Sequence, residues 1–89
     1  MRFKVLLKKS VENKLRKLPN NIRLKFDALA WLLSDAGPAG AHGWSNYGKL
    51  NENEYHCHLS YHYVACWRYE KKTIIIEVTY VGSREDAPY

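Results

Sequence analysis

The chain contains no long hydrophobic run. No apolar stretch approaches the roughly 20 residues that a bilayer-spanning helix needs, which excludes such a helix. The first residues, Met-Arg-Phe-Lys-Val, also lack the apolar stretch and the small-residue cleavage site of a secretory signal. We therefore expect a cytoplasmic protein with no membrane partner.

Cysteine is scarce as well. Cys57 and Cys66 both lie in apolar, strand-like sequence, and their spacing matches no Cys-x-x-Cys metal or redox motif. In a reducing cytosol, two buried or half-buried thiols are expected rather than a disulfide. The leading expectation is therefore that the protein has no cofactor and no metal.

The length limits the protein to one core. A chain of 89 residues has no room for a second hydrophobic core, so we expect a single domain over residues 1–89. Apolar residues make up 46% of the chain and aromatic residues 13%. That composition supports a modest core and argues against disorder. There are no repeats and no low-complexity segments.

Acidic residues are outnumbered by basic ones. The chain has 14 Lys and Arg against 9 Asp and Glu, with a formal net charge of +5 and a pI near 9.3. A solvated helix face is one explanation. The second explanation is a surface that binds a polyanion or an acidic partner, and a pI above 9 in so small a domain favours it. The amino-terminal half holds the densest group of cations: Lys8, Lys9, Lys14, Arg16, Lys17, Arg23 and Lys25.

The amino-terminal half predicts a strand and two helices. Residues 2–8 are typical of a strand, and Ser10 is a suitable N-cap for a helix that ends before Pro19. Asn20 and Asn21 can cap the second helix. Its apolar stripe recurs at i, i+4, i+7 and i+11, with Trp31 off the stripe: Ile22, Phe26, Leu29 and Leu33.

The remaining sequence predicts one long loop and three strands. Residues 35–48 hold four glycines, and a long loop inside a small domain is often functional. Strand-like runs follow at 49–59, 63–69 and 73–81, of which the last, rich in β-branched residues, is predicted to be central and to stop at Gly82. The order β-α-α-β-β-β predicts an α+β fold, with two helices packed on one face of a small, mostly antiparallel sheet.

Two histidines alternate in the first of these strands. In Tyr55-His56-Cys57-His58-Leu59, the residues i and i+2 share one face of the strand, so His56 and His58 point the same way. Histidine exchanges protons near neutral pH because its unperturbed pKa is about 6.5. A pair of imidazoles on a basic domain therefore suits RNA cleavage, although the same pattern also fits the solvent face of an edge strand.

The order of several short motifs resembles the RelE/ParE superfamily of toxins from toxin–antitoxin systems. The resemblance spans nearly the whole chain and rests on these segments: Lys17-Leu18-Pro19 at the end of the first helix, Tyr63-Val64-Ala65-Cys66-Trp67-Arg68, the Ile-rich strand, and Tyr80-Val81-Gly82-Ser83-Arg84-Glu85-Asp86. In the RelE branch, two lysines occupy alternate positions of a Tyr-Lys-x-Lys-Leu strand. The resemblance places His56 and His58 at those positions.

The resemblance also implies roles for residues near the end of the chain. Arg84 corresponds to an arginine that follows the terminal strand, and Tyr89 matches a terminal tyrosine with a one-residue gap. The superfamily's Tyr-Arg-x-x-Tyr arginine falls on Val64, so this chain lacks it there. We infer that Arg68, on the same face of the strand, can stand in, and we add Lys49 as a second candidate for substrate binding.

These residues suggest a mechanism of RNA cleavage by the RNA's own 2′-hydroxyl. One of His56 and His58 would act as general base, and the other as acid or oxyanion partner. Arg84 and Arg68 would stabilise charge on the phosphate, and Tyr89 would stack on a base or assist proton transfer. The products would be a 2′,3′-cyclic phosphate and a 5′-hydroxyl. The resemblance further implies that binding on the ribosome positions the mRNA, and that a cognate antitoxin neutralises the toxin in a hetero-oligomer.

Three alternatives stay open. A toxin of the ParE branch would inhibit DNA gyrase and would need no acid–base residues, and a non-catalytic module would bind only RNA or the antitoxin. The third alternative is a zinc site. If the two strands of the hairpin pair so that the residue numbers of opposite partners sum to 122, Cys66 lies opposite His56. His56, His58 and Cys66 could then approach one ion. Arg68 could also serve only to pair with Glu77 across the hairpin.

Overall fold

The amino-terminal half forms one strand and two helices. The computed structural model describes residues 2–89. Strand β1 (Lys4–Leu7) leads into helix α1 (Lys9–Leu15), and helix α2 (Asn20–Ala36) follows Pro19, whose extended backbone separates the two helices. A short 3-10 helix, η1 (Gly37–Ala41), continues from α2. The predicted strand and both predicted helices are confirmed.

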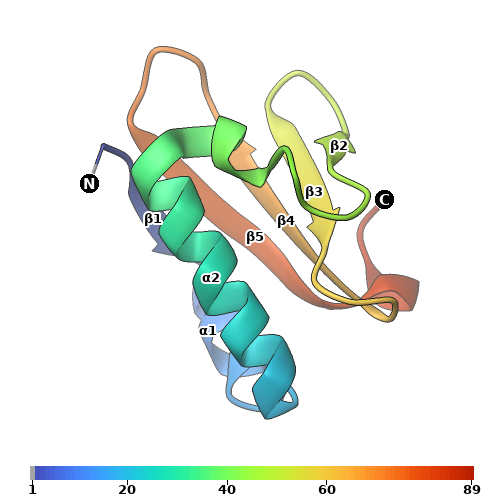
Figure 1. The fold of residues 1–89 in the computed structure, drawn as a ribbon. Coiled ribbons are helices and arrows are strands. Elements are labelled where there is room, and N and C mark those ends of the chain that lie inside the picture. The colour runs from blue at the N-terminus through green and yellow to red at the C-terminus, as the bar shows by residue number, and fades with distance from the viewer. Residues whose placement is uncertain (1) are drawn as a thin grey trace.

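Four strands follow, and they form a single sheet with β1. They are β2 (Gly48–Lys49), β3 (Glu54–His58), β4 (Tyr63–Tyr69) and β5 (Ile75–Ser83), and the 3-10 helix η2 (Arg84–Asp86) ends the ordered elements. The strand order is β1-β5-β4-β3-β2 (Figure 1). Only β1 pairs in parallel, with β5, and every other pairing is antiparallel. The predicted α+β architecture is therefore confirmed.

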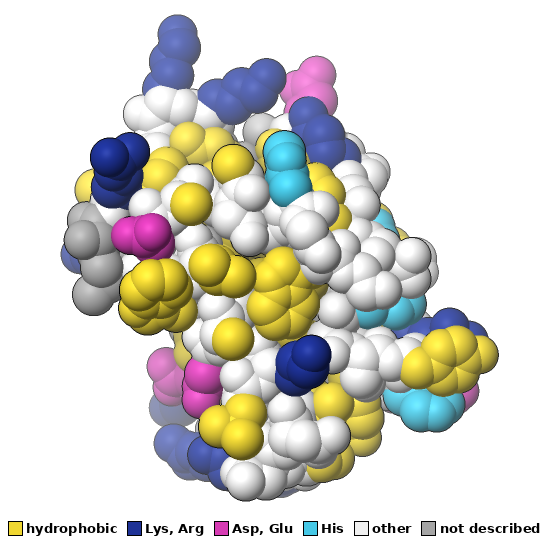
Figure 2. All heavy atoms as spheres, in the orientation of Figure 1, with side chains coloured by type: hydrophobic (Ala, Val, Ile, Leu, Met, Phe, Trp, Pro, Cys, Tyr) yellow, Lys and Arg dark blue, Asp and Glu magenta, His cyan; other side chains and the backbone are white. Residues whose placement is uncertain are grey.

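Both helices pack on one face of this sheet and bury the core there. The apolar stripe of α2 is confirmed, since Phe26, Leu29 and Leu33 are buried. They join Val11 of α1 and the inward residues of the strands, among them Trp67, in one hydrophobic cluster. Figure 1 shows α2 crossing in front of the strands, and Figure 2 shows the hydrophobic side chains across the middle of that view. Within residues 2–89, no α-helix packs on the other face of the sheet.

The helix starts differ from the prediction. Lys8, rather than Ser10, occupies the N-cap position of α1, where its carbonyl accepts hydrogen bonds from the N–H groups of Val11 and Glu12. Pro19 takes the same position before α2, so Asn20 is already helical. In both helices the N-cap residue has extended backbone angles, and its side chain makes no capping hydrogen bond.

The predicted strand 49–59 is interrupted. The side-chain oxygen of Asn51 accepts hydrogen bonds from the backbone N–H groups of Asn53 and Glu54, and this local turn separates β2 from β3. The loop 35–48 is also shorter than predicted, because α2 and η1 extend into it as far as Ala41.

Two predictions about the last strand are wrong. The middle strand of the sheet is β4, while β5 is second from the edge. Gly82 does not stop β5, which runs on to Ser83. A Cβ at Gly82 would lie 2.8 Å from the hydroxyl oxygen of Tyr80. A side chain at position 82 would therefore displace the end of the Tyr80 side chain, whose hydroxyl donates a 2.7 Å hydrogen bond to the Ser83 carbonyl.

Candidate functional site

The histidine pair lies on the face of the sheet that carries no helix. On β3, Tyr55 and Cys57 point into the core, whereas His56 and His58 are half-buried and outside it. The register pairs His56 with Cys66 and His58 with Val64, as a sum of 122 requires. The structure thus confirms that the two imidazoles share one face, and we call this surface of β3, β4 and β5 the histidine face.

The terminal tyrosine packs on the first of these histidines. The ring centroids of His56 and Tyr89 are 4.8 Å apart, and Nδ1 of His56 is buried with no hydrogen-bond partner among residues 2–89. Burial lowers the pKa of His56 from its ordinary value, and the nearby charge of His58 lowers it further. A lowered pKa favours the neutral form of His56 near neutral pH, which is the form that a general base needs.

Arg84 lies beside the β3–β4 turn, which directly follows His58. It begins η2 directly after β5, and its backbone N–H donates a 2.8 Å hydrogen bond to the carbonyl of His62 in the β3–β4 turn. Its guanidinium stacks over Tyr61 of the same turn, 4.5 Å from the ring centroid. The turn that follows His58 therefore holds Arg84 in place.

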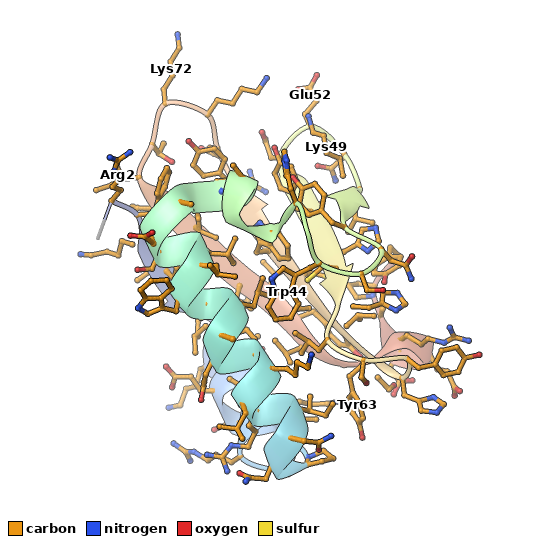
Figure 3. All side chains as sticks on the ribbon, in the orientation of Figure 1. Arg2, Trp44, Lys49, Glu52, Tyr63 and Lys72 are labelled. Carbon is orange, nitrogen blue, oxygen red and sulfur yellow. The ribbon has the colours of Figure 1, made fainter. Side chains whose placement is uncertain are left out.

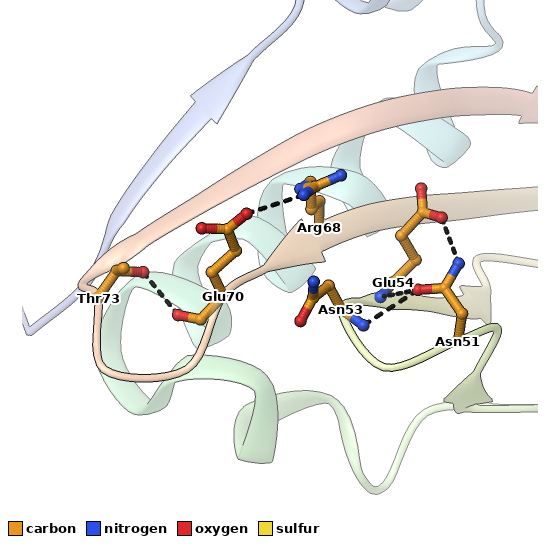
Figure 4. A network of polar contacts seen from close by, with 6 residues as sticks. All are labelled: Asn51, Asn53, Glu54, Arg68, Glu70 and Thr73. Atoms are coloured by element: carbon orange, nitrogen blue, oxygen red, sulfur yellow. Dashed lines mark hydrogen bonds and ion pairs between the residues drawn. The ribbon is translucent and has the colours of Figure 1, made fainter.

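Arg68 is on the histidine face but is surrounded by carboxylates. It forms a 2.8 Å ion pair with Glu70, and Glu54 lies opposite it on β3 (Figure 4). The register places Glu77 opposite it on β5. The hydrogen bond and charge of Glu70, followed by the charges of Glu54 and Glu77, raise the pKa of Arg68. Its partner is Glu70 rather than the Glu77 that the sequence suggested. A phosphate approaching Arg68 would meet these carboxylates as well.

The structure does not bring Lys49 together with the histidines. Lys49 pairs with Tyr55 across β2 and β3, and its ammonium lies 5.7 Å from the Tyr55 ring centroid. Tyr55 points to the helix-covered face, so Lys49 lies beside that face instead. Gly48, its neighbour, is the residue opposite His56.

A cleft that the sequence analysis did not identify adjoins His58. It has a volume of about 500 Å³ and is lined by side chains from three segments, which include Lys25 of α2, Trp44 of the loop before β2, and Tyr61 of the β3–β4 turn. Figure 3 shows Trp44 between α2 and β3. The glycine-rich loop indicated a functional segment, but nothing in the sequence linked its tryptophan to a lysine of α2.

The thiols show no sign of activation. Burial raises the pKa of both Cys57 and Cys66 to about 12, so both stay protonated at neutral pH. Cys66 does lie opposite His56, as the register predicted. Within residues 2–89, however, no group of three His, Cys, Asp or Glu side chains is arranged to hold a metal ion. In the same range, no helix combines the length and apolarity that crossing a membrane requires.

Comparison with solved structures identifies the fold. No family model and no curated protein matches this sequence. A chain of the archaeal RelE–RelB complex from Pyrococcus horikoshii OT3 superposes with a TM-score of 0.77, at 19% identity, over 98% of this chain and 100% of that one. The fold is that of RelE.

Two Staphylococcus aureus structures extend this result. A chain of the YoeB–YefM complex matches with a TM-score of 0.69 and 10% identity over 94% of this chain and 99% of its own. The YoeB dimer gives the same TM-score and identity over 89% and 93%. These matches confirm the RelE-like architecture that the sequence motifs suggested. At such low sequence identity they show a shared fold only.

Proposed function

We propose that this protein is a toxin of a toxin–antitoxin pair that cleaves mRNA on the ribosome. The observation that carries the proposal is the placement of His56 and His58 side by side on the face of a RelE-like sheet that lies opposite the helices. Tyr89 packs against one end of this pair, and Arg84 is fixed beyond the other. An acid, a base and a permanent cation are the groups that cleavage by an internal 2′-hydroxyl requires.

The proposed reaction assigns one proton transfer to each imidazole. Neutral His56 takes the proton of the 2′-hydroxyl, and the resulting oxygen attacks the adjacent phosphorus. The bond from phosphorus to the 5′-oxygen breaks, and His58 gives its proton to that oxygen. The products are a 2′,3′-cyclic phosphate and a 5′-hydroxyl, with Arg84 stabilising the charge that develops on the phosphoryl oxygens.

Tyr89 must move or exchange partners in this scheme. Its ring rests on His56, and more than half of its surface is exposed (54%). A nucleobase of the substrate can replace His56 as its stacking partner, which would uncover the imidazole. Lys49 is left out of this assignment because of its place beside the other face, and Arg68 is assigned a minor role because Glu70 already binds it.

A cognate antitoxin is the proposed partner. The RelE and YoeB chains with this fold were solved in complexes with RelB and YefM, which supports a hetero-oligomer here. The net charge of +5 favours an acidic partner as well as RNA. We place the protein in the cytoplasm, where the ribosome would position the mRNA and supply much of the rate.

Replacing both histidines tests the proposal. The double variant His56→Gln, His58→Gln should abolish mRNA cleavage in a translation extract and relieve growth arrest, because general acid–base catalysis contributes about 10²- to 10⁴-fold. His42→Gln is the matched control, since His42 is exposed and packs on Tyr47 away from the pair. Circular dichroism should show an intact fold in both variants. Undiminished cleavage by the double variant would refute the proposed chemistry.

The runner-up function is inhibition of DNA gyrase, as in the ParE branch. Arg68 is held by Glu70, and the position of the superfamily's arginine is the buried Val64, so part of the expected phosphate clamp is missing. Arrest that persists in the double histidine variant together with blocked supercoiling would select this function. If the wild-type chain causes neither cleavage nor arrest, a non-catalytic module that binds RNA or an antitoxin is the remaining explanation.

A further inference from the structure

We propose that the cleft between α2, the loop before β2 and the β3–β4 turn binds one unpaired nucleobase of the RNA, together with an adjoining phosphate. This inference rests on the proposed function, because the cleft ends at His58 and would hold a nucleotide next to the scissile bond. The cleft volume of about 500 Å³ lies within the roughly 300–1,000 Å³ that is usual for small-ligand sites.

The cleft combines aromatic faces with cations, the pairing that single-stranded nucleic acids favour. Trp44 and Tyr61 both line it. The ammonium of Lys25 is 6.0 Å from the Trp44 ring centroid, and the guanidinium of Arg84 is 4.5 Å from that of Tyr61. Each ring can stack on a base while its cation contacts a phosphate.

The residues that line the cleft also distinguish it from a second hollow, which lies around Arg68 on the histidine face. No Asp or Glu lines the cleft, and Ser45, Asn46 and Ser60 supply hydrogen-bonding groups for a base edge. The hollow around Arg68, in contrast, is lined by Glu70 and Glu77. A bound phosphate would therefore meet no carboxylate in the cleft, whereas Glu70 and Glu77 would repel it in the hollow around Arg68.

The backbone holds the aromatic wall in position. The N–H of His58 donates a 2.7 Å hydrogen bond to the carbonyl of Ser45, which fastens the loop along the edge of β3. The N–H of Trp44 donates to the carbonyl of Ala41, and the half-buried indole packs against the core. A wall ordered before binding loses little conformational freedom when a base stacks on it.

Tryptophan fluorescence can test the site without any cleavage. The probe is a hexanucleotide of 2′-O-methyl RNA, which binds as RNA but has no 2′-hydroxyl to react. Binding is followed by fluorescence anisotropy of the labelled probe and by quenching of the protein's own emission. Trp31→Phe removes the exposed tryptophan outside the cleft and should leave both the affinity and the quenching in place.

Changes to the cleft should act differently. Trp44→Phe should abolish most of the quenching but keep the affinity within about threefold, since a ring remains, whereas Trp44→Leu should weaken binding about tenfold. Lys25→Gln, an exposed position, should weaken binding and lower the salt dependence of the affinity by about one phosphate contact. Because Trp44 also contacts the core, Lys25→Gln and Tyr61→Leu keep the test valid if Trp44→Leu fails to fold.

The outcomes separate this inference from the proposed function. Probe binding that Lys25→Gln and Tyr61→Leu both weaken supports the cleft, even if the wild-type chain cleaves no mRNA. Cleavage that depends on His56 and His58, with probe affinity unchanged in all cleft variants, overturns the cleft assignment and leaves the nuclease intact. Quenching of Trp44 by an acidic partner polypeptide but not by the probe would also overturn it, and would assign the cleft to the partner.

Discussion

The imidazole of His56 lies in a drier environment than that of an exposed histidine. Tyr89 covers it, and burial followed by the charge of His58 lowers its pKa below the ordinary value of 6.5. Because the folded pKa lies below the unfolded one, the unfolded state binds more protons as the pH falls through 6.5. His56 therefore stabilises the folded protein above that pH, and this stabilisation is lost as the pH falls toward the lower, folded pKa.

The first prediction concerns the titration of His56. Followed by NMR of its ring protons, His56 should titrate below pH 6.5 in the wild type. His58→Gln should raise its pKa by removing a nearby positive charge, and Tyr89→Ala should raise it by restoring solvent. The cleavage rate should increase with pH through the same pKa, because the base must be neutral. A His56 that titrates above 6.5 would contradict the assignment of this residue as the base.

The two arginines of the histidine face are predicted to differ in importance. Arg84→Gln should lower the cleavage rate by about 10²-fold or more, because it removes the cation that we propose stabilises the charge developing on the phosphate. Arg68→Gln should cost less than about tenfold, since Glu70 already holds that guanidinium. Single-turnover cleavage with the same RNA would compare them. Equal losses would mean that Arg68 leaves Glu70 to bind the phosphate, and Glu70→Gln would then accelerate cleavage.

Among the elements, α2 shows how one glycine sets the direction of the chain. The helix ends at Ala36, and Gly37 adopts a φ of 71°, which favours glycine. A Cβ at this position would lie 2.5 Å from the ring of Phe3. The turn therefore sends the chain into η1 while Phe3 packs against it, and it leads to the loop that carries Trp44.

Gly37→Ala should destabilise the protein by at least about 1 kcal/mol, from backbone strain and from the displaced Phe3 ring. Gly43→Ala is the control, because a Cβ at Gly43 meets no atom within 4 Å and its φ is not positive. That variant should stay within about 0.5 kcal/mol of the wild type. Urea denaturation would measure both. A neutral Gly37→Ala variant would show that the turn can relax without cost.

At the scale of the whole molecule, the sheet divides two environments. Helices and core cover one face, and the other carries the histidines, Arg84 and the acidic group around Arg68. Lys and Arg side chains lie mainly at the periphery of the view in Figure 2. A strand that faces both environments, such as β3, must alternate apolar and polar residues, and this alternation made the histidine pair visible in the sequence.

The single hydrophobic cluster predicts cooperative unfolding. In urea, tryptophan fluorescence and circular dichroism should report one coincident transition, with a slope of about 1–3 kcal/mol per molar urea. Trp67, buried at the centre of the cluster, and the helices should lose their signals together. Two separated transitions would contradict the prediction of one domain over residues 1–89.

The sequence by itself determined the order and type of the main helices and strands and the faces of the strands, but not the residues at which each element begins and ends. The stripe of α2, the strand at 63–69 and the shared face of His56 and His58 follow from the periods of helix and strand, which are local properties of the chain. Only the tertiary structure decided which distant residues meet. Glu70 rather than Glu77 binds Arg68, Tyr89 covers His56, and Lys25 joins Trp44 and Tyr61 beside His58, because such contacts depend on register and packing across the fold rather than on spacing along it.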